Sequence, residues 1–240
     1  MTNSASAENA LSPTPSPPER GGGPRGGLVR PTPARPARLA ILISGRGSNM
    51  LALLEATKTG VLQGLAEVAV VFSNQPDALG LEAAAAHGCP VAALPSQGRH
   101  REAFDAEAAQ LLQQYQPDLV VLAGYMRILS SAFIQPFAGR ILNIHPADTH
   151  QHQGLHAYEW AFDNQLPETK ITVHLVDEGL DTGPILAQQT VDLRGADTLA
   201  EVERRGLAVE HELYARALAD LIQNKRNVMS SVAETSRLLE

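Results

Sequence analysis

The stretch Leu39-Ala-Ile-Leu-Ile43, followed directly by Ser44-Gly-Arg-Gly-Ser-Asn49, decides the fold class of this chain. Five consecutive apolar residues indicate a strand that is buried on both faces, as the strands of parallel sheets are. The glycines allow a tight turn, and the segment from Met50 to Lys58 then has the periodicity of a helix that ends near Gly60. A buried strand, a glycine-rich turn and a helix are the first half of a βαβ unit.

The same alternation continues toward the carboxyl terminus. Further strands are predicted at residues 68–72, 91–94, 119–123 and 141–145, and helices at 80–87 and 101–115. This rhythm predicts one α/β domain with a doubly wound, mostly parallel sheet and helices on both faces. Two later apolar runs, 171–176 and 185–191, are joined by a short acidic loop and predict an antiparallel hairpin. A last helix is predicted over 198–224, where Gly206 is a candidate interruption.

The two ends of the chain are predicted to lie outside this domain. Residues 1–37 are rich in Pro, Gly, Ser and Arg and contain almost no large apolar residue. Such a segment cannot bury enough apolar surface to offset the entropy of ordering it, so we expect a disordered tail. Residues 226–240 follow the last helical pattern and are expected to form a second tail, which leaves 38–225 as the domain.

The composition excludes several classes of protein. A formal net charge of −7 over 240 residues argues against a nucleic-acid binder, which normally carries a basic surface. No apolar run reaches the roughly 20 residues of a membrane helix. The single cysteine, Cys89, excludes an internal disulfide and fits a reducing compartment. We therefore expect a cytoplasmic protein whose partners are small molecules; nothing in the sequence indicates its oligomeric state.

The loop Ser44–Asn49 is the first candidate binding site. Ligands of doubly wound sheets bind beyond the carboxyl ends of the strands, and N–H groups at a helix start attract an anion. No Lys-Ser/Thr pair follows, so the loop is not a P-loop, and Met50 takes the place of the third glycine of a dinucleotide fingerprint. The loop therefore favours a single phosphate group; a tight turn capped by Asn49 is the structural alternative.

The strand Ile141-Leu-Asn-Ile-His145 carries the second candidate site. Residues two apart in a strand face the same side, so Asn143 and His145 project together while Leu142 and Ile144 pack on the other face. Pro146 ends the strand and places His145 at the crevice. An asparagine amide can donate to a developing oxyanion, and a histidine can donate or transfer a proton. The alternative is a buried polar pair with a purely structural role.

The acidic loop of the late hairpin contains the third candidate. Asp177, Glu178 and Asp181 are either solvated turn residues or partners of the histidine. A carboxylate near His145 would favour the imidazolium and raise the pKa of His145, which would keep it proton-donating near neutral pH. Spacing alone does not choose among the three acids.

Six segments, in order and with matching spacing, resemble the folate-dependent formyltransferase family, and within it the glycinamide ribonucleotide formyltransferases. They are Ile43–Asn49, Ser73-Asn74 with Asp77–Leu81, Leu122–Leu129, Asn143–Pro146, Gly154–His156 and Leu180–Pro184. The resemblance covers almost all of residues 38–225 and implies the Rossmann-like formyltransferase fold. It implies transfer of the formyl group of 10-formyltetrahydrofolate, as a co-substrate, to the amine of glycinamide ribonucleotide in de novo purine biosynthesis.

The resemblance also assigns roles to individual residues. It implies that Asn143, His145 and Asp181 are the catalytic residues. The implied mechanism is direct attack of the amine on the formyl carbon, without a covalent enzyme intermediate. The loop residues Gly47, Ser48 and Asn49 are implied to bind the substrate phosphate, and Glu210 is implied to contact the ribonucleotide. The residues implied to bind the folate are Arg101, Met126, Arg127, Ile128, Leu129 and Asn143.

One segment departs from the family pattern. After His145-Pro146 the family usually has Ser-Leu-Leu-Pro and an aromatic residue before the glycine, whereas this chain has Ala147-Asp-Thr-His-Gln-His-Gln153. The histidines of this region, with His156, raise the question of a metal, but their irregular spacing gives no recognised ligand pattern and the family chemistry needs none. We expect no metal, and the changed loop puts the identity of the substrate in question.

Several other functions are alternatives. A formyltetrahydrofolate hydrolase would use the same three residues with water as acceptor, and a related transferase would act on another amine. A methionyl-tRNA formyltransferase would need a carboxy-terminal RNA-binding domain and a basic surface. A non-catalytic folate-binding module would keep the fold without reason to keep Asn143, His145 and Asp181 together. A nicotinamide dehydrogenase is disfavoured by Met50 in place of the third glycine.

Overall fold

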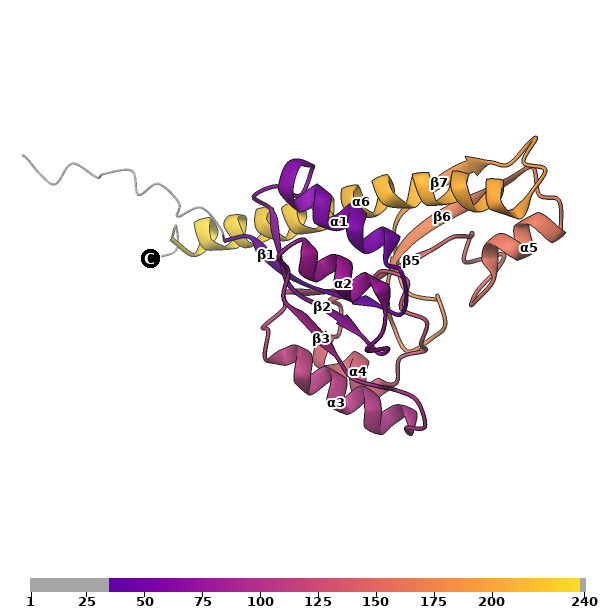
Figure 1. The fold of residues 1–240 in the computed structure, drawn as a ribbon. Coiled ribbons are helices and arrows are strands. Elements are labelled where there is room, and N and C mark those ends of the chain that lie inside the picture. The colour runs from indigo at the N-terminus through magenta and orange to yellow at the C-terminus, as the bar shows by residue number, and fades with distance from the viewer. Residues whose placement is uncertain (1–34, 238–240) are drawn as a thin grey trace, which may run out of the picture. The chain divides into compact units, whose positions relative to one another are not determined.

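The computed structural model describes residues 35–237, which form a seven-stranded sheet flanked by helices (Figure 1). The strand order is β3-β2-β1-β4-β5-β6-β7. The strands are β1 (Ala37–Ile43), β2 (Ala66–Ser73), β3 (Val91–Ala93), β4 (Leu119–Leu122), β5 (Ile141–His145), β6 (Glu168–Leu175) and β7 (Ile185–Asp192). The helices are α1 (Ser48–Thr59), α2 (Leu79–Ala86), α3 (Arg101–Gln113), α4 (Ser131–Ile134), α5 (Ala157–Asp163) and α6 (Leu199–Arg237), with a 3₁₀ turn η1 (Gln135–Phe137).

Strands β1 to β5 pair in parallel, whereas β6 and β7 are antiparallel additions at one edge. The predicted doubly wound sheet with a late antiparallel hairpin is therefore confirmed. Parallel strands share one direction, so the loops that follow β1, β4 and β5 leave the sheet at the same edge. That edge is where the sequence predicts the functional residues.

The core lies on both faces of the sheet. Leu39, Ile41 and Ile43 of β1 are buried in an apolar cluster that includes residues of α1 and α6. Ala40 and Leu42 face the other side and are buried in a second cluster with residues of α3 and α4. Alternate residues of one strand thus enter two cores, which is why the strand is a continuous apolar run.

Three short elements are not predicted by the sequence. They are α4, η1 and α5, of four, three and seven residues. Helices of one or two turns do not repeat an apolar face often enough for a 3.6-residue period to be recognised. Helix α5 begins directly after His156, whose φ of 65° is left-handed, so the helix start depends on a backbone conformation that the side-chain pattern does not indicate.

Secondary structure continues past both predicted domain boundaries. Strand β1 begins at Ala37, and the Arg35 guanidinium pairs with the Asp118 carboxylate, at 2.6 Å, before β4. Residues 1–34 of the predicted tail lie outside the described residues, and their assignment as a tail stays a prediction. At the other end, α6 continues past residue 225 to Arg237. The helical pattern weakens after 224 while the helix itself does not end there.

Helix α6 is continuous through Gly206, so the candidate interruption at this glycine does not occur. A Cβ at residue 206 would lie 2.2 Å from the Tyr158 hydroxyl and ring edge, so the glycine makes room for the Tyr158 ring of α5. The Tyr158 hydroxyl in turn donates to the Glu210 carboxylate one turn further along α6. Gly206 therefore serves helix packing and does not end the helix.

No helix within residues 35–237 combines the length and apolarity that crossing a bilayer requires.

We expect Gly206→Ala to destabilise the protein by about 1–3 kcal/mol, although alanine is the better helix former by about 1 kcal/mol. The reason is that the new methyl group overlaps the Tyr158 ring, which must move. The measurement is chemical denaturation of the single variants and of the double variant with Tyr158→Ala. In the Tyr158→Ala background Gly206→Ala should be neutral or stabilising, and an equal loss in both backgrounds would contradict the packing explanation.

Candidate active site

Strand β5 brings Asn143 and His145 to the carboxyl edge of the sheet. Leu142 and Ile144 lie in the apolar cluster beneath α1 and α6, so Asn143 and His145 face the opposite side, as the two-residue period predicts. His145 is only 4% exposed and Asn143 is half-buried. Two polar side chains held out of water on a central strand need partners to offset their desolvation.

Asp181 supplies those partners from the loop between β6 and β7. Its Oδ1 accepts a hydrogen bond from Asn143 Nδ2 at 3.2 Å, and its Oδ2 lies 3.6 Å from His145 Nδ1. The Gly154 N–H also donates to Oδ2, at 2.9 Å. Asp181 has a left-handed φ of 52°, which turns its carboxylate back toward β5. The structure thus brings together the three residues that the sequence predicts as catalytic.

The other two acids of the loop are not part of this group. Asp177 Oδ1 accepts from the Gly179 N–H and from the Thr182 hydroxyl, so it stabilises the turn itself. Glu178 is exposed. The choice among three acids that spacing left open is therefore made by the geometry of the loop.

His174 is a fourth member of the group that the sequence reasoning missed. It lies on β6 directly opposite Asn143 in the antiparallel register. Its Nε2 is 3.4 Å from Asp181 Oδ1 and 3.3 Å from Asn143 Nδ2, and its ring is buried. A signal for it exists, because Thr172 and His174 alternate with the apolar Ile171 and Val173 as a polar face of β6. The apolar residues of the run 171–176 predict a strand but give no indication of this role.

The charges of this group differ from the sequence expectation. Burial raises the pKa of Asp181, but hydrogen bonds from His174 and from the Gly154 N–H, with the nearby charges of His145 and His174, outweigh it and lower the pKa to about 2. Burial lowers the pKa of His145, and His152 and His174 add to this, while Asp181 and the His152 carbonyl oppose it without prevailing. The expectation that a carboxylate would keep His145 charged near neutral pH is wrong, because desolvation of the ring outweighs one carboxylate that lies 3.6 Å away.

We expect the His145 imidazole to titrate below pH 6.5, because its buried ring disfavours the charged form. In Asp181→Asn the midpoint should fall further, since the carboxylate raises the pKa of His145 in the native protein. The measurement is an NMR titration of histidine-labelled protein, with His145 assigned from His145→Ala. Asp177→Asn, in the same loop, is the matched control and should leave the midpoint unchanged. A midpoint above 6.5, or a rise in Asp181→Asn, would contradict the electrostatic account.

The loop after β1 has the backbone of an anion site. Gly47 precedes α1 with a φ of 73°, and its carbonyl accepts the first helical bond from the Leu51 N–H. A Cβ at Gly47 would lie 2.9 Å from the Met50 methyl group, so both conformation and space require glycine here. Gly47 and Ser48 are accessible, and no acidic residue stands in the first turn of α1. The N–H groups of this turn are therefore oriented to attract a negative group.

Asn49 and Glu210 meet beneath that loop. The Asn49 Nδ2 donates to one oxygen of the buried Glu210 carboxylate, and the Tyr158 hydroxyl donates to the other. Asn49 Oδ1 is buried and has no hydrogen-bond partner within the described part of the chain. Glu210, which the resemblance assigns to the ribonucleotide, is thus adjacent to the loop after β1 although 161 residues separate it from Asn49.

The loop after β4 carries the residues that the resemblance assigns to the folate. Met126 and Ile128 are 64% and 58% exposed, which leaves two large apolar side chains in solvent beside the site. Leu129 is buried, and the Arg127 guanidinium lies 4.4 Å from the centre of the Phe104 ring and 3.9 Å from the buried Asp105 carboxylate. Arg101 is exposed at the first residue of α3, the helix that also carries Phe104.

Hydrogen bonds join the loop after β1 to the loop after β4. The Ser44 N–H donates to the Gly124 carbonyl at 3.0 Å, and the Met126 N–H donates to the Ser44 hydroxyl at 2.8 Å. The Ser44 hydroxyl itself donates to the Asn74 side-chain oxygen at 2.6 Å. The loops after β1, β2 and β4 therefore form one connected edge, next to the end of β5.

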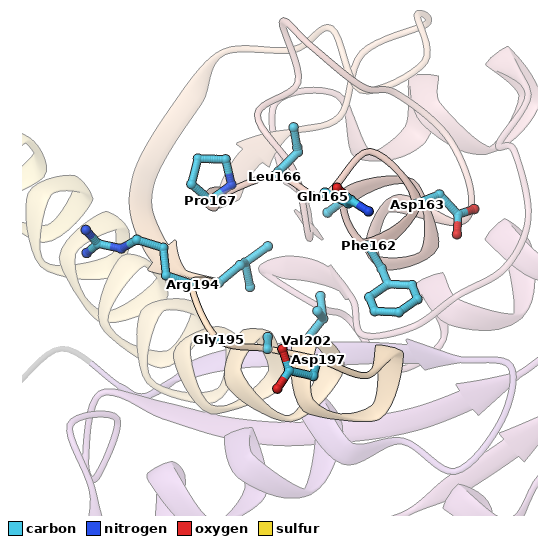
Figure 2. Close-up of a pocket in the computed structure, with 12 residues that line it drawn as sticks. Phe162, Asp163, Gln165, Leu166, Pro167, Arg194, Gly195, Asp197 and Val202 are labelled. Carbon is cyan, nitrogen blue, oxygen red and sulfur yellow. The ribbon is translucent and has the colours of Figure 1, made fainter.

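No group of three or more His, Cys, Asp or Glu side chains is arranged to hold a metal ion in the part of the chain that the structure describes. A cavity of about 690 Å³ lies elsewhere, between α5, the start of β6 and the turn from β7 into α6. Figure 2 shows side chains from these elements around it, among them Phe162, Pro167 and Arg194. None of its lining residues is a predicted site residue.

Comparison with known proteins identifies the family. A model described as formyl transferase matches residues 37–218. The phosphoribosylglycinamide formyltransferase of Escherichia coli (strain K12) is 42% identical over 177 residues, which are 73% of this chain and 82% of the relative. The trifunctional purine biosynthetic protein adenosine-3 of Drosophila melanogaster is 39% identical over 201 residues, 83% of this chain but only 15% of that longer protein.

Solved structures show the same similarity. The crystal structure of phosphoribosylglycinamide formyltransferase from Bacillus halodurans has a TM-score of 0.73 and 41% identity, covering 77% of this chain and 95% of that one. Glycinamide ribonucleotide transformylase 1 from Symbiobacterium toebii has a TM-score of 0.74 and 39% identity, covering 79% and 89%. The chain shares the fold of these two solved structures and is about 40% identical to them over most of their length. Together with the match of residues 37–218 to the family model, this shows that the chain belongs to the formyl transferase family.

Proposed function

We propose that this chain transfers the formyl group of 10-formyltetrahydrofolate to the amine of glycinamide ribonucleotide, a step of purine biosynthesis. The observation that carries the proposal is the convergence of Asn143, His145 and Asp181 beside two joined loops, one with an anion site and one with exposed apolar side chains. The phosphate of a phosphorylated amine suits the first loop, and the flat ring system of a folate suits the second. Family membership and the names of the similar enzymes support the same reaction.

Each substrate has a proposed place. The N–H groups of Gly47, Ser48 and Asn49 bind the phosphate at the start of α1, and Glu210 with Asn49 faces the ribose. The folate lies against the loop of residues 126–129, whose exposed apolar side chains suit a flat ring system, with Arg101 as a further contact. Holding both substrates at one edge of the sheet orients the amine toward the formyl carbon.

The proposed chemistry follows from the hydrogen bonds of the catalytic group. The amine nitrogen attacks the formyl carbon, a C–N bond forms, and the carbonyl oxygen takes the negative charge. Asn143 Nδ2 is the donor available to that oxygen, because the N–H of the neutral His145 ring, on Nε2, faces the His152 carbonyl at 3.0 Å. The proton that leaves the amine moves to His145 Nδ1, where Asp181 stabilises the imidazolium. The C–N10 bond then breaks, N10 receives the proton, and the products are formyl amide and tetrahydrofolate.

A largely neutral His145 suits this sequence of steps. With its pKa below the ordinary value, the ring has a free nitrogen near neutral pH and can accept the amine proton. The neutral ring still carries one N–H, on Nε2, and therefore remains a hydrogen-bond donor to the His152 carbonyl. The lowered pKa of Asp181 keeps that carboxylate charged throughout, so it acts as a fixed negative partner and not as the base.

The proposal places the protein in the cytoplasm, where glutathione keeps thiols reduced. The single cysteine, Cys89, fits this placement because it has no partner for an internal disulfide. Burial raises the pKa of its thiol, which makes it a poor nucleophile. The net charge of −7 favours small-molecule partners over nucleic acid.

The test follows a ¹³C-labelled formyl group by NMR when the protein is mixed with labelled formyl-folate and glycinamide ribonucleotide. The label should appear in the formyl amide of the ribonucleotide. The dephosphorylated amine is the matched control substrate, and it should react with a Michaelis constant raised by about 100-fold, the loss of roughly 2.7 kcal/mol of charge-assisted binding. Label that appears only as free formate, or equal use of both amines, would contradict the proposed acceptor.

A further inference from the structure

His152 stands beside the catalytic histidine within the loop of residues 147–153 that departs from the family pattern. Its ring stacks on Trp160 of α5, with centroids 4.8 Å apart and planes 16° from parallel. The His152 ring also lies nearly parallel to the His145 ring, with centroids 6.2 Å apart. His152 is thus the ring that neighbours both Trp160 of α5 and His145 at the end of β5.

The backbone of His152 fixes the protonation pattern of His145. The His152 carbonyl oxygen lies 3.0 Å from His145 Nε2. A carbonyl can only accept a hydrogen bond, so Nε2 carries the hydrogen of the neutral ring. The lone pair is then on Nδ1, which faces the Asp181 carboxylate at 3.6 Å. This is the tautomer that the proposed reaction needs, because Nδ1 can take the amine proton while Asp181 stabilises the resulting charge.

A competing tautomer is available to the same ring. With the hydrogen on Nδ1, His145 would donate to Asp181, and a charged acceptor makes the stronger hydrogen bond at equal geometry. The distances decide against it here, since 3.6 Å exceeds a normal N–H···O length and 3.0 Å does not. The preference therefore depends on how firmly the His152 carbonyl is held in place.

The side chain of His152 holds that carbonyl. Its Nε2 lies 3.0 Å from the Leu155 carbonyl, and its ring rests on Trp160, so two contacts fix residue 152. His150 and Gln151, which precede it, are exposed. We propose that His152 is a positioning residue for His145: its side chain, held by Trp160 and the Leu155 carbonyl, keeps the His152 carbonyl where it maintains the Nε2–H tautomer. The catalytic meaning of this inference rests on the proposed function, whereas the tautomer rests on the contacts alone.

The test reads the tautomer from the ¹⁵N shifts of histidine-labelled full-length protein without substrates, at a pH where the imidazoles are neutral. Wild-type His145 should be in the Nε2–H form, and His152→Ala should populate the Nδ1–H form. Trp160→Leu removes the other side of the stack and should shift the tautomer in the same direction, which keeps the test valid if His152→Ala does not fold. His152→Phe keeps the ring on Trp160 and should retain the wild-type tautomer.

His150→Ala is the matched control, because it removes an exposed histidine from the same loop. An unchanged tautomer in both His152→Ala and Trp160→Leu, or an equal change in His150→Ala, would overturn the inference. In the transfer assay, His152→Ala should lower kcat roughly tenfold with both Michaelis constants within about threefold, as a misplaced catalytic group does. If the variants shift the tautomer but the wild-type protein transfers no formyl group, only the proposed function is contradicted. If the wild-type protein transfers the formyl group but the variants do not shift the tautomer, only this inference is contradicted.

Discussion

Replacing His145 by alanine is expected to lower kcat for formyl transfer by about 10³-fold, with little change in either Michaelis constant. The change removes the nitrogen that accepts the amine proton and the imidazolium charge that then forms beside the developing oxyanion. Both contributions arise in the transition state, so kcat and kcat/KM should fall together. Steady-state kinetics with both substrates varied measure this directly.

Two further variants separate chemistry from folding in this experiment. His145 is buried against Asp181, so His145→Ala leaves a buried carboxylate with one partner fewer and is expected to lower the melting temperature as well. His145→Asn keeps an amide donor near Asp181 and should recover stability but not activity. His150→Ala, which removes an exposed histidine, should behave as wild type. A folded His145→Ala protein with full activity would refute the catalytic role of His145.

Replacing Gly47 by valine should raise the Michaelis constant for the ribonucleotide by about 100-fold and that for the folate by less than about threefold. Gly47 has a φ of 73°, a region that β-branched residues avoid, and a Cβ would meet the Met50 methyl group at 2.9 Å. The first turn of α1 must therefore shift, and the N–H groups that we propose bind the phosphate shift with it. The loop after β4, which we propose binds the folate, is anchored at Ser44 and Gly124 and should be less affected.

Gly64→Val is the matched control for this prediction. Gly64 has a φ of 70°, close to that of Gly47, but nothing lies within 4 Å of its Cβ position, and it stands in the turn between α1 and β2. The Gly64→Val substitution thus imposes the same backbone strain, of order 1–3 kcal/mol, at the far end of α1. If Gly47→Val and Gly64→Val change both Michaelis constants alike, the loop is not the phosphate site.

The sheet was predictable from the sequence because its strands are regular. Runs such as 39–43 and 119–123 are apolar at every position, since both faces of a central parallel strand are buried, and the structure confirms these strands and the late hairpin. The helix boundary at 224 was not predictable in the same way, because the periodicity fades before α6 ends. Gly206 misled for a related reason: its role is set by Tyr158, which is 48 residues earlier in the chain and whose contact no local pattern records.

The candidate site was predictable in its residues more than in its electrostatics. The two-residue period placed Asn143 and His145 on one face, and the structure brings Asp181 to them. The predicted pKa direction of His145 was wrong because the pKa depends on how deeply the ring is buried, which the sequence does not reveal. His174 was missed because its role arises only when β6 pairs antiparallel with β5 and sets it opposite Asn143.

The most direct test of the account measures the loss of formyl-folate by the wild-type protein with and without glycinamide ribonucleotide. The proposed anion site at Gly47–Asn49 and the proposed transfer to an amine predict that consumption of formyl-folate depends on the ribonucleotide and that one formyl amide forms per folate released. Without the amine, the rate should be lower by at least about 100-fold, because water lacks the phosphate that holds the acceptor in place. Equal consumption of formyl-folate with and without the amine would identify a hydrolase and contradict the account.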